Sequence, residues 1–137
     1  MTTVSSDAVA SGLMVERFKA GSVLCRSAKY TASAALAAND IIKMVPVPEG
    51  ARLLRIDYKF SAFGAGRTLD IGDATTVDKF VDGDDVSAAG TDSVVLDEVL
   101  SADAVVQAKV LGDTMPENAT LSIHVYYKMA GAIADED

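Results

Sequence analysis

The sequence has few of the residues on which most catalytic and metal sites depend. Its 137 residues include one cysteine, Cys25, one histidine, His124, and no tryptophan. A single cysteine excludes an internal disulfide framework and a zinc site built from several cysteines. A single histidine leaves little material for a catalytic triad or a histidine-rich metal site. We therefore predict that the chain is not an enzyme, and we assign it no cofactor.

Basic residues and long apolar runs are also scarce. Twelve Lys and Arg against 20 Asp and Glu give a net charge of −8 at pH 7. Such a chain lacks the cationic surface that binds phosphate backbones, so we expect no nucleic-acid partner. No uncharged apolar run approaches the ~18 residues of a membrane-spanning helix, so we expect no membrane partner. Hydrophobic residues make up 50% of the chain, which argues against low-complexity disorder.

The acidic residues are concentrated in the second half of the chain. Residues 1–69 contain nine basic and five acidic side chains, whereas residues 70–137 contain three basic and 15 acidic ones. A dense acidic segment must be solvated, paired with an outside partner or bound to cations. The aspartates that a calcium ion would draw together are Asp70, Asp73, Asp78, Asp82, Asp84 and Asp85. Their spacing does not match the helix–loop–helix calcium loop, so we favour a solvated loop or docking surface and keep calcium as the alternative.

Alternating apolar and polar residues predict two strands far apart in the sequence. Leu54, Ile56, Tyr58 and Phe60 share one face of the first, and apolar residues alternate in the same way along residues 121–128. This pattern is typical of half-buried antiparallel strands. Other strand-like runs recur with turn residues between them at roughly 8–12-residue spacing, which favours a sandwich or barrel. These runs are Val15–Phe18, Val23–Cys25, Ile41–Val47, Thr68–Ile71, Phe80–Val81, Val94–Leu100 and Val105–Leu111.

We predict an all-β fold, an antiparallel β-sandwich that is jelly-roll-like and has about eight strands. A helix is the alternative for residues 94–111, because Val95, Val99 and Leu100 also fit a helical period near 3.6. The expected domain covers residues 13–130. An N-terminal arm of residues 1–12 precedes it, and an acidic tail of residues 131–137 follows.

We interpret the isolated reactive side chains without assigning them a catalytic role. His124 lies on the polar side of the last predicted strand, and as a base it would need a nucleophile and an orienting group from elsewhere. An exposed or interface histidine needs neither. Arg26 could lower the pKa of Cys25, but a buried, inert thiol is the commoner case. The Gly64–Thr68 segment lacks the lysine and helix of a phosphate-binding loop and indicates a glycine turn.

Five segments between residues 36 and 91 share a pattern of strands joined by proline and glycine–aspartate turns. They are Leu36–Val45, Val47–Leu54, Leu69–Asp73, Asp78–Gly83 and Val86–Thr91. In this pattern the chain resembles the capsid cement and decoration proteins of tailed bacteriophages. The resemblance implies a β-sandwich attached to the outside of an icosahedral shell, with no catalytic residue.

The resemblance also implies a partner and a location. The partner is the major capsid protein, and the location is the outer capsid surface of the virion. We expect each copy to clamp neighbouring capsid subunits against the pressure of internal DNA, as either a needed cement or a dispensable decoration. Self-association is also expected, as a homodimer in preference to a trimer. The expected capsid-contact residues are Val4, Val9, Leu13, Asp78, Asp82, Asp84 and Asp85.

Two other classes of function stay open from the sequence. The first is a jelly-roll carbohydrate-binding module by which a virion attaches to a cell surface. Such modules present exposed aromatic rings, and Tyr30 and Tyr126 are the candidates here. The second is a small hydrolase or isomerase, which requires His124 to face a pocket together with a carboxylate.

Overall fold

The computed structural model describes residues 3–6 and 23–129, which form nine strands and no helix. The strands are β1 (Thr3–Ser5), β2 (Leu24–Thr31), β3 (Ile41–Val47), β4 (Ala51–Phe60), β5 (Thr68–Gly72), β6 (Val81–Asp85), β7 (Gly90–Val99), β8 (Ala104–Leu111) and β9 (Thr120–Met129). The all-β prediction is confirmed, and residues 94–111 belong to β7, β8 and their connection rather than to a helix. With no helix in the described ranges, none there could cross a membrane.

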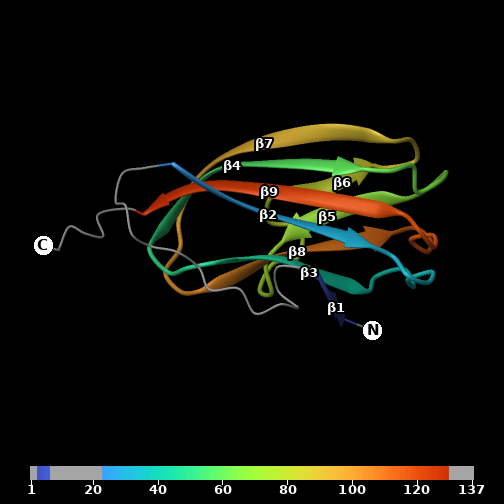
Figure 1. The fold of residues 1–137 in the computed structure, drawn as a ribbon, viewed down its shortest axis with the longest axis horizontal. Coiled ribbons are helices and arrows are strands. Elements are labelled where there is room, and N and C mark those ends of the chain that lie inside the picture. Colours follow the sequence, from blue (N-terminus) through green and yellow to red (C-terminus); the bar gives the residue numbers. More distant parts are fainter. Residues whose placement is uncertain (1–2, 7–22, 130–137) are drawn as a thin grey trace, which may run out of the picture.

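Two sheets pack face to face in a sandwich (Figure 1). One has the order β1-β3-β8-β5-β6 and the other the order β2-β9-β4-β7. The pairing is nested along the sequence, because β2 pairs with β9, β3 with β8, β4 with β7 and β5 with β6, all antiparallel. A long hairpin rolled up on itself gives this order, which is that of an eight-stranded jelly roll. The predicted jelly-roll-like sandwich is therefore confirmed, with β1 added at one edge.

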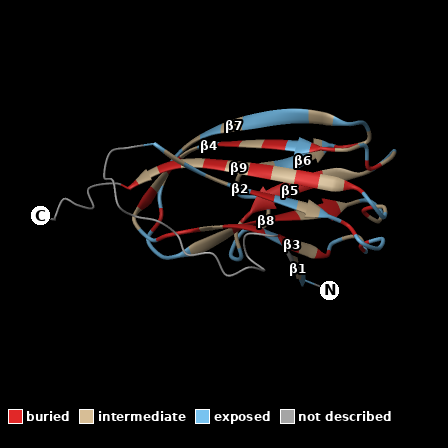
Figure 2. Ribbon diagram, viewed as in Figure 1, coloured by how far each residue is buried: buried red, intermediate tan, exposed pale blue. Residues whose placement is uncertain are grey.

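The hydrophobic core lies between the two sheets (Figure 2). In β9 the buried residues are Leu121, Ile123, Val125, Tyr127 and Met129, and the residues between them are only half-buried. Successive side chains of a strand point to opposite faces, so every second residue enters the core. Burying one such aliphatic side chain contributes roughly 1.5–3 kcal/mol.

The alternation predicted for residues 54–60 is wrong at its first residue. Ile56, Tyr58 and Phe60 are buried as expected, but Leu54 is half-buried and Leu53 is buried instead. The register of β4 with both β7 and β9 shifts between Leu53 and Arg55. This β-bulge inserts one residue into the strand and moves the preceding residues to the opposite face.

The first described residues form β1, an edge strand of the five-stranded sheet. β1 pairs in parallel with β3, and the half-buried Val4 packs against the core. The main-chain N–H of Ser6 donates to the carbonyl of Lys43 at 2.6 Å, and the Ser6 hydroxyl donates to the carbonyl of Met44. The strand predicted at Val15–Phe18, the rest of the arm and the acidic tail lie outside the described residues.

Candidate interaction surfaces

The acidic segment forms the β5–β6 hairpin, at one edge of the five-stranded sheet. Asp70 on β5 is buried, and its carboxylate accepts a hydrogen bond of 2.8 Å from the main chain of Gly83. Burial raises the pKa of Asp70. The Gly83 bond opposes this effect, whereas the neighbouring charges of Asp82 and Asp78 add to it, so the pKa lies above its usual value. Asp70 on β5 therefore contacts the main chain of β6 inside the hairpin.

Asp73 organises the loop between β5 and β6. Its Oδ1 accepts hydrogen bonds from the main-chain N–H groups of Thr75 at 3.0 Å and Thr76 at 2.8 Å, and its Oδ2 lies 3.5 Å from Lys79 Nζ. Burial raises the pKa of Asp73, but the bonds from Thr76 and Thr75 and the charge of Lys79 outweigh it and bring the pKa below its usual value. Lys79 also pairs with Glu98 on β7, which ties the loop to the other sheet.

Asp84 points back toward the fold. The Tyr58 hydroxyl on β4 donates to Asp84 Oδ2 at 2.6 Å, which links the two sheets. Burial raises the pKa of Tyr58 far above its usual value, and the hydrogen bond and charge of Asp84 raise it further. Tyr58 therefore stays a neutral donor at physiological pH, and Asp84 has a structural partner within the chain.

Three of the predicted acidic contact residues face solvent. Asp78, Asp82 and Asp85 are exposed, and the carboxylate of Asp85 accepts the N–H of Ser87 at 2.9 Å. The hydrogen bonds from Ser87 hold the pKa of Asp85 below its usual value. These three carboxylates are therefore accessible to solvent on one hairpin.

The predicted contact residues of the arm are only partly described. Val4 is half-buried on β1, at the edge of the five-stranded sheet. Val9 and Leu13 lie outside the described residues.

The six aspartates considered for calcium do not converge. Asp70, Asp73 and Asp84 each have separate partners within the fold, and the exposed ones lie along the hairpin. Within residues 3–6 and 23–129, no group of three or more His, Cys, Asp and Glu side chains is placed to hold a metal ion. The described structure gives the calcium alternative no support.

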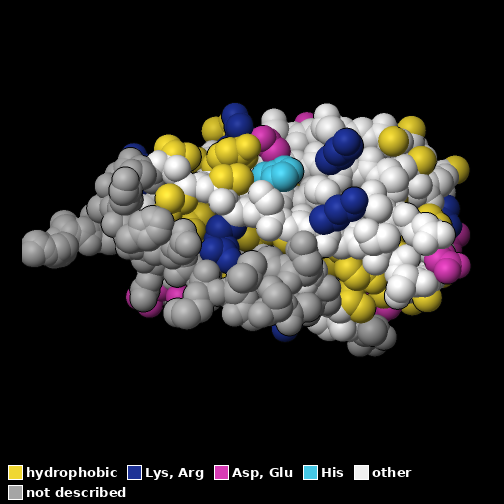
Figure 3. All heavy atoms as spheres, viewed as in Figure 1, with side chains coloured by type: hydrophobic (Ala, Val, Ile, Leu, Met, Phe, Trp, Pro, Cys, Tyr) yellow, Lys and Arg dark blue, Asp and Glu magenta, His cyan; other side chains and the backbone are white. Residues whose placement is uncertain are grey.

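His124 lies on the outer face of the β2-β9-β4-β7 sheet, the face toward the viewer in Figure 3. Its Nδ1 is 2.7 Å from Ser27 Oγ on β2, and the register places Asp57 of β4 opposite it. A depression of about 600 Å³ beside it is lined in part by Asp57 and Ser93. Asp57, however, forms an ion pair of 3.0 Å with Arg55 rather than orienting the imidazole. The row of Ser27, His124 and Asp57 therefore lacks the carboxylate–imidazole contact of a hydrolytic triad.

The remaining side chains singled out from the sequence have ordinary roles. Cys25 is exposed, which corrects the expectation of a buried thiol, because it occupies an outward position of β2, 3.8 Å from Ser27 Oγ. Tyr30 packs against the core, and the Arg55 guanidinium lies 4.6 Å from the centroid of the Tyr126 ring. Tyr30 is therefore partly covered by the core, and one face of the Tyr126 ring is covered by Arg55.

Comparison with known proteins identifies the fold. No protein-family model matches the sequence, and no curated protein does either. A chain from the capsid of Ralstonia phage GP4 is similar in structure, with a TM-score of 0.76 and 19% identity over 94% of this chain and 99% of that one.

Two further capsid structures contain similar chains. One from the capsid asymmetric unit of cyanophage Pam1 has a TM-score of 0.69 and 14% identity, over 88% of this chain and 95% of that one. One from the acid-stable capsid of the Helicobacter pylori bacteriophage KHP30 has a TM-score of 0.63 and 17% identity, over 80% of this chain and 90% of that one. At these identities the likeness establishes a shared fold, over 80–94% of this chain and 90–99% of the others.

Proposed function

We propose that this chain is a structural protein of a phage virion that binds the outer surface of the icosahedral capsid and clamps neighbouring major capsid subunits. The observation that carries the proposal is the near end-to-end likeness to chains of three phage capsids, each a domain of about this size. The sequence resemblance to cement and decoration proteins, which is independent of the fold comparison, supports the accessory role. A mechanical role requires no catalytic constellation.

Clamping follows from simple linkage. A protein that binds only the assembled lattice stabilises that lattice by mass action, by about 2.7 kcal/mol per site at a free concentration of 100 Kd. Contacts to two neighbouring subunits act together, because the second contact forms at a high effective concentration. In this proposal, modest individual contacts therefore add up to a larger stabilisation of the shell.

The exposed side of the acidic hairpin supplies one contact surface in this proposal. Asp78, Asp82 and Asp85 point to solvent, and Lys79 between them is occupied by Asp73 and Glu98. Charged groups at the rim of an interface accelerate and orient association. We expect basic groups of the capsid surface to meet this hairpin. The arm, including Val4, is the proposed second contact.

Self-association is proposed through β7, the edge strand of its sheet. Val95 and Val99 on this strand are 81% and 46% exposed, unusual values for valine. An unpaired edge strand is a template for pairing, and antiparallel pairing of two copies is two-fold symmetric. This geometry favours the homodimer over the trimer.

Co-sedimentation tests the proposed function. DNA-filled shells from the same phage, stripped of their outer proteins, are mixed with the purified chain. We expect saturable binding at a fixed ratio to the shell subunit, and shells that resist heating better when the chain is bound. A folded chain that does not bind at low or moderate salt would show that the proposed function is wrong.

A further inference from the structure

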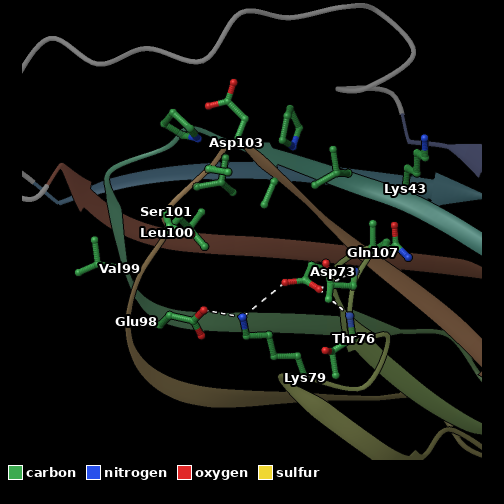
Figure 4. A pocket seen from close by; sticks show the side chains of 18 residues that line it. Lys43, Asp73, Thr76, Lys79, Glu98, Val99, Leu100, Ser101, Asp103 and Gln107 are labelled. Carbon is green, nitrogen blue, oxygen red and sulfur yellow. Dashed lines mark hydrogen bonds and ion pairs between the residues drawn. The ribbon is translucent and has the colours of Figure 1, made fainter.

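A groove of about 710 Å³ crosses the outer face of β3 and β8 (Figure 4). The loop between β5 and β6 forms one side, and the end of β7 with its connection to β8 forms another. The apolar part of the lining comes mainly from prolines and aliphatic side chains: Pro46, Val47, Pro48, Ala74, Leu100, Ala104 and Val105. This size lies within the range of ~300–1,000 Å³ that is usual for ligand sites.

Gln107 is the unusual residue of this groove. It lies on β8 and is 6% exposed, yet its carboxamide has no hydrogen-bond partner among the described residues. Its strand neighbours are Lys43 on β3 and Gly72 on β5, so its side chain projects from the sheet into the groove. The carboxamide is not among the fully buried atoms, so it keeps contact with solvent in the groove, where a bound ligand can reach it.

The wall beside Gln107 is built in advance of any ligand. The carboxylate of Asp73 holds the loop, and Lys79 connects Asp73 to Glu98 on β7 (Figure 4). Gly72 allows the loop to fold this closely onto the sheet, because a Cβ there would lie 2.1 Å from the Thr76 carbonyl oxygen. A wall held in place in this way loses little conformational entropy on binding.

Two side chains of opposite charge line the groove and form no ion pair with a described residue. Asp103 accepts the main-chain N–H of Glu49 at 2.7 Å but has no cationic partner among the described residues. Lys43, at a different part of the lining, is exposed and forms no ion pair within the described part of the chain. An occupant with a cation near Asp103 and a carboxylate near Lys43 would complement both.

We propose that this groove binds an extended peptide segment of the shell subunit, with the Gln107 carboxamide hydrogen-bonded to the segment's main chain. A carboxamide offers the donors and the acceptor that a peptide unit requires. The proline and aliphatic walls accommodate small apolar side chains, and Asp103 and Lys43 set the direction of the segment. The inference rests on the proposed function and names the site through which it operates.

The Gln107→Met variant provides the first test. Methionine has a similar shape and removes the carboxamide, so the free chain should keep its urea midpoint or gain slightly. Shell binding in the co-sedimentation assay should weaken about tenfold, because the segment's peptide group then loses its partner. Ser122→Ala, on the outer face of the other sheet, is the matched control and should bind as the wild type does.

A second pair of variants tests the charges. Asp103→Asn keeps an acceptor for the Glu49 N–H, and Lys43→Gln removes the opposite charge. Each should weaken shell binding several-fold and reduce its dependence on salt. If the wild type binds shells normally and Gln107→Met, Asp103→Asn and Lys43→Gln all bind equally well, the groove is not the binding site. The proposed function would then still stand. Absence of wild-type binding would overturn both the groove and the proposed function.

Photo-crosslinking identifies the occupant. A benzoylphenylalanine at Ala74, on the exposed rim, should crosslink to one segment of the shell subunit in decorated shells, as read by mass spectrometry. The same group at Thr91, on the other sheet, should not capture that segment. A crosslink from position 74 to this chain itself, or to a second copy of it, would overturn the proposal.

Discussion

At the scale of single residues, carboxylates that look alike in the sequence have opposite effects on stability. Asp70 is buried, and its pKa lies above the usual value mainly because of that burial. Asp73 accepts two main-chain hydrogen bonds and faces Lys79, and its pKa lies below the usual value. Folding therefore opposes the ionisation of Asp70 and favours that of Asp73.

The pH dependence of two variants checks this assignment. Above its folded pKa, ionised Asp70 costs stability, so Asp70→Asn should raise the free energy of unfolding at pH 7. That gain should fade below the unfolded pKa of ~3.9, where both states are protonated.

Asp73→Asn should show the opposite sign. The stability that ionised Asp73 contributes is present above ~3.9 and is lost as the pH falls through its lower folded pKa. This variant should cost up to about 1 kcal/mol at pH 7, because its ion pair with Lys79 is partly solvated. Urea unfolding between pH 2 and 7 measures both variants, and equal signs for the two at pH 7 would contradict the assignment.

At the scale of elements, the turn after β5 and the edge strand β7 have features that single substitutions can test. The β5–β6 loop depends on the absence of a side chain at Gly72, where the obstacle is main chain and cannot rotate away. The edge strand β7 presents Val95 and Val99 to solvent, although strand edges are usually protected by charge.

Gly72→Ala should destabilise the chain by about 1–3 kcal/mol, because the loop must move away from the new methyl group. Gly66→Ala is the control. Gly66 has a φ of +80°, but its added Cβ would meet nothing within 4 Å, so only the conformational cost of about 1 kcal/mol remains. Thermal unfolding compares the two, and an equal loss in both would show that the close approach at Gly72 is unimportant.

Val95→Lys tests the β7 edge. Its side chain is already 81% exposed, so the monomer should keep its stability to within about 0.5 kcal/mol. Sedimentation equilibrium should show a weakened homodimer, because each interface gains two buried positive charges. Thr91→Lys, farther along the same strand, is the control, and a dimer unaffected by Val95→Lys would place the self-association elsewhere.

At the scale of the whole molecule, acidic side chains are densest on the β5–β6 hairpin, although Asp57 and Asp97 also lie among the arginines of the other sheet. The outer face of the β2-β9-β4-β7 sheet carries scattered Lys and Arg side chains (Figure 3), whereas the β5–β6 hairpin is acidic. In a molecule with net charge −8, this hairpin is therefore the local acidic surface that we expect to face a basic partner.

Neutralising Asp78, Asp82 and Asp85 together to Asn should slow association with stripped shells and flatten the salt dependence of binding, because these carboxylates are exposed. The free energy of unfolding should change little, because all three side chains are exposed. The control carries the same charge change at Asp92, Asp113 and Glu117, which are also exposed. Identical salt slopes for the two triple variants would show that net charge, rather than the hairpin, governs binding.

The sequence alone determined the features that depend on neighbours along the chain. Alternation in residues 121–128 predicted β9, and regularly spaced turns predicted the all-β sandwich, because the pleat and the turn are local properties. Tertiary structure decided the rest. The bulge between Leu53 and Arg55 and the inward position of Asp84 depend on strands that lie far away in sequence. The groove joins Lys43, Asp73 and Gln107 only because β3 and β5 both pair with β8, a long-range contact that no local pattern encodes.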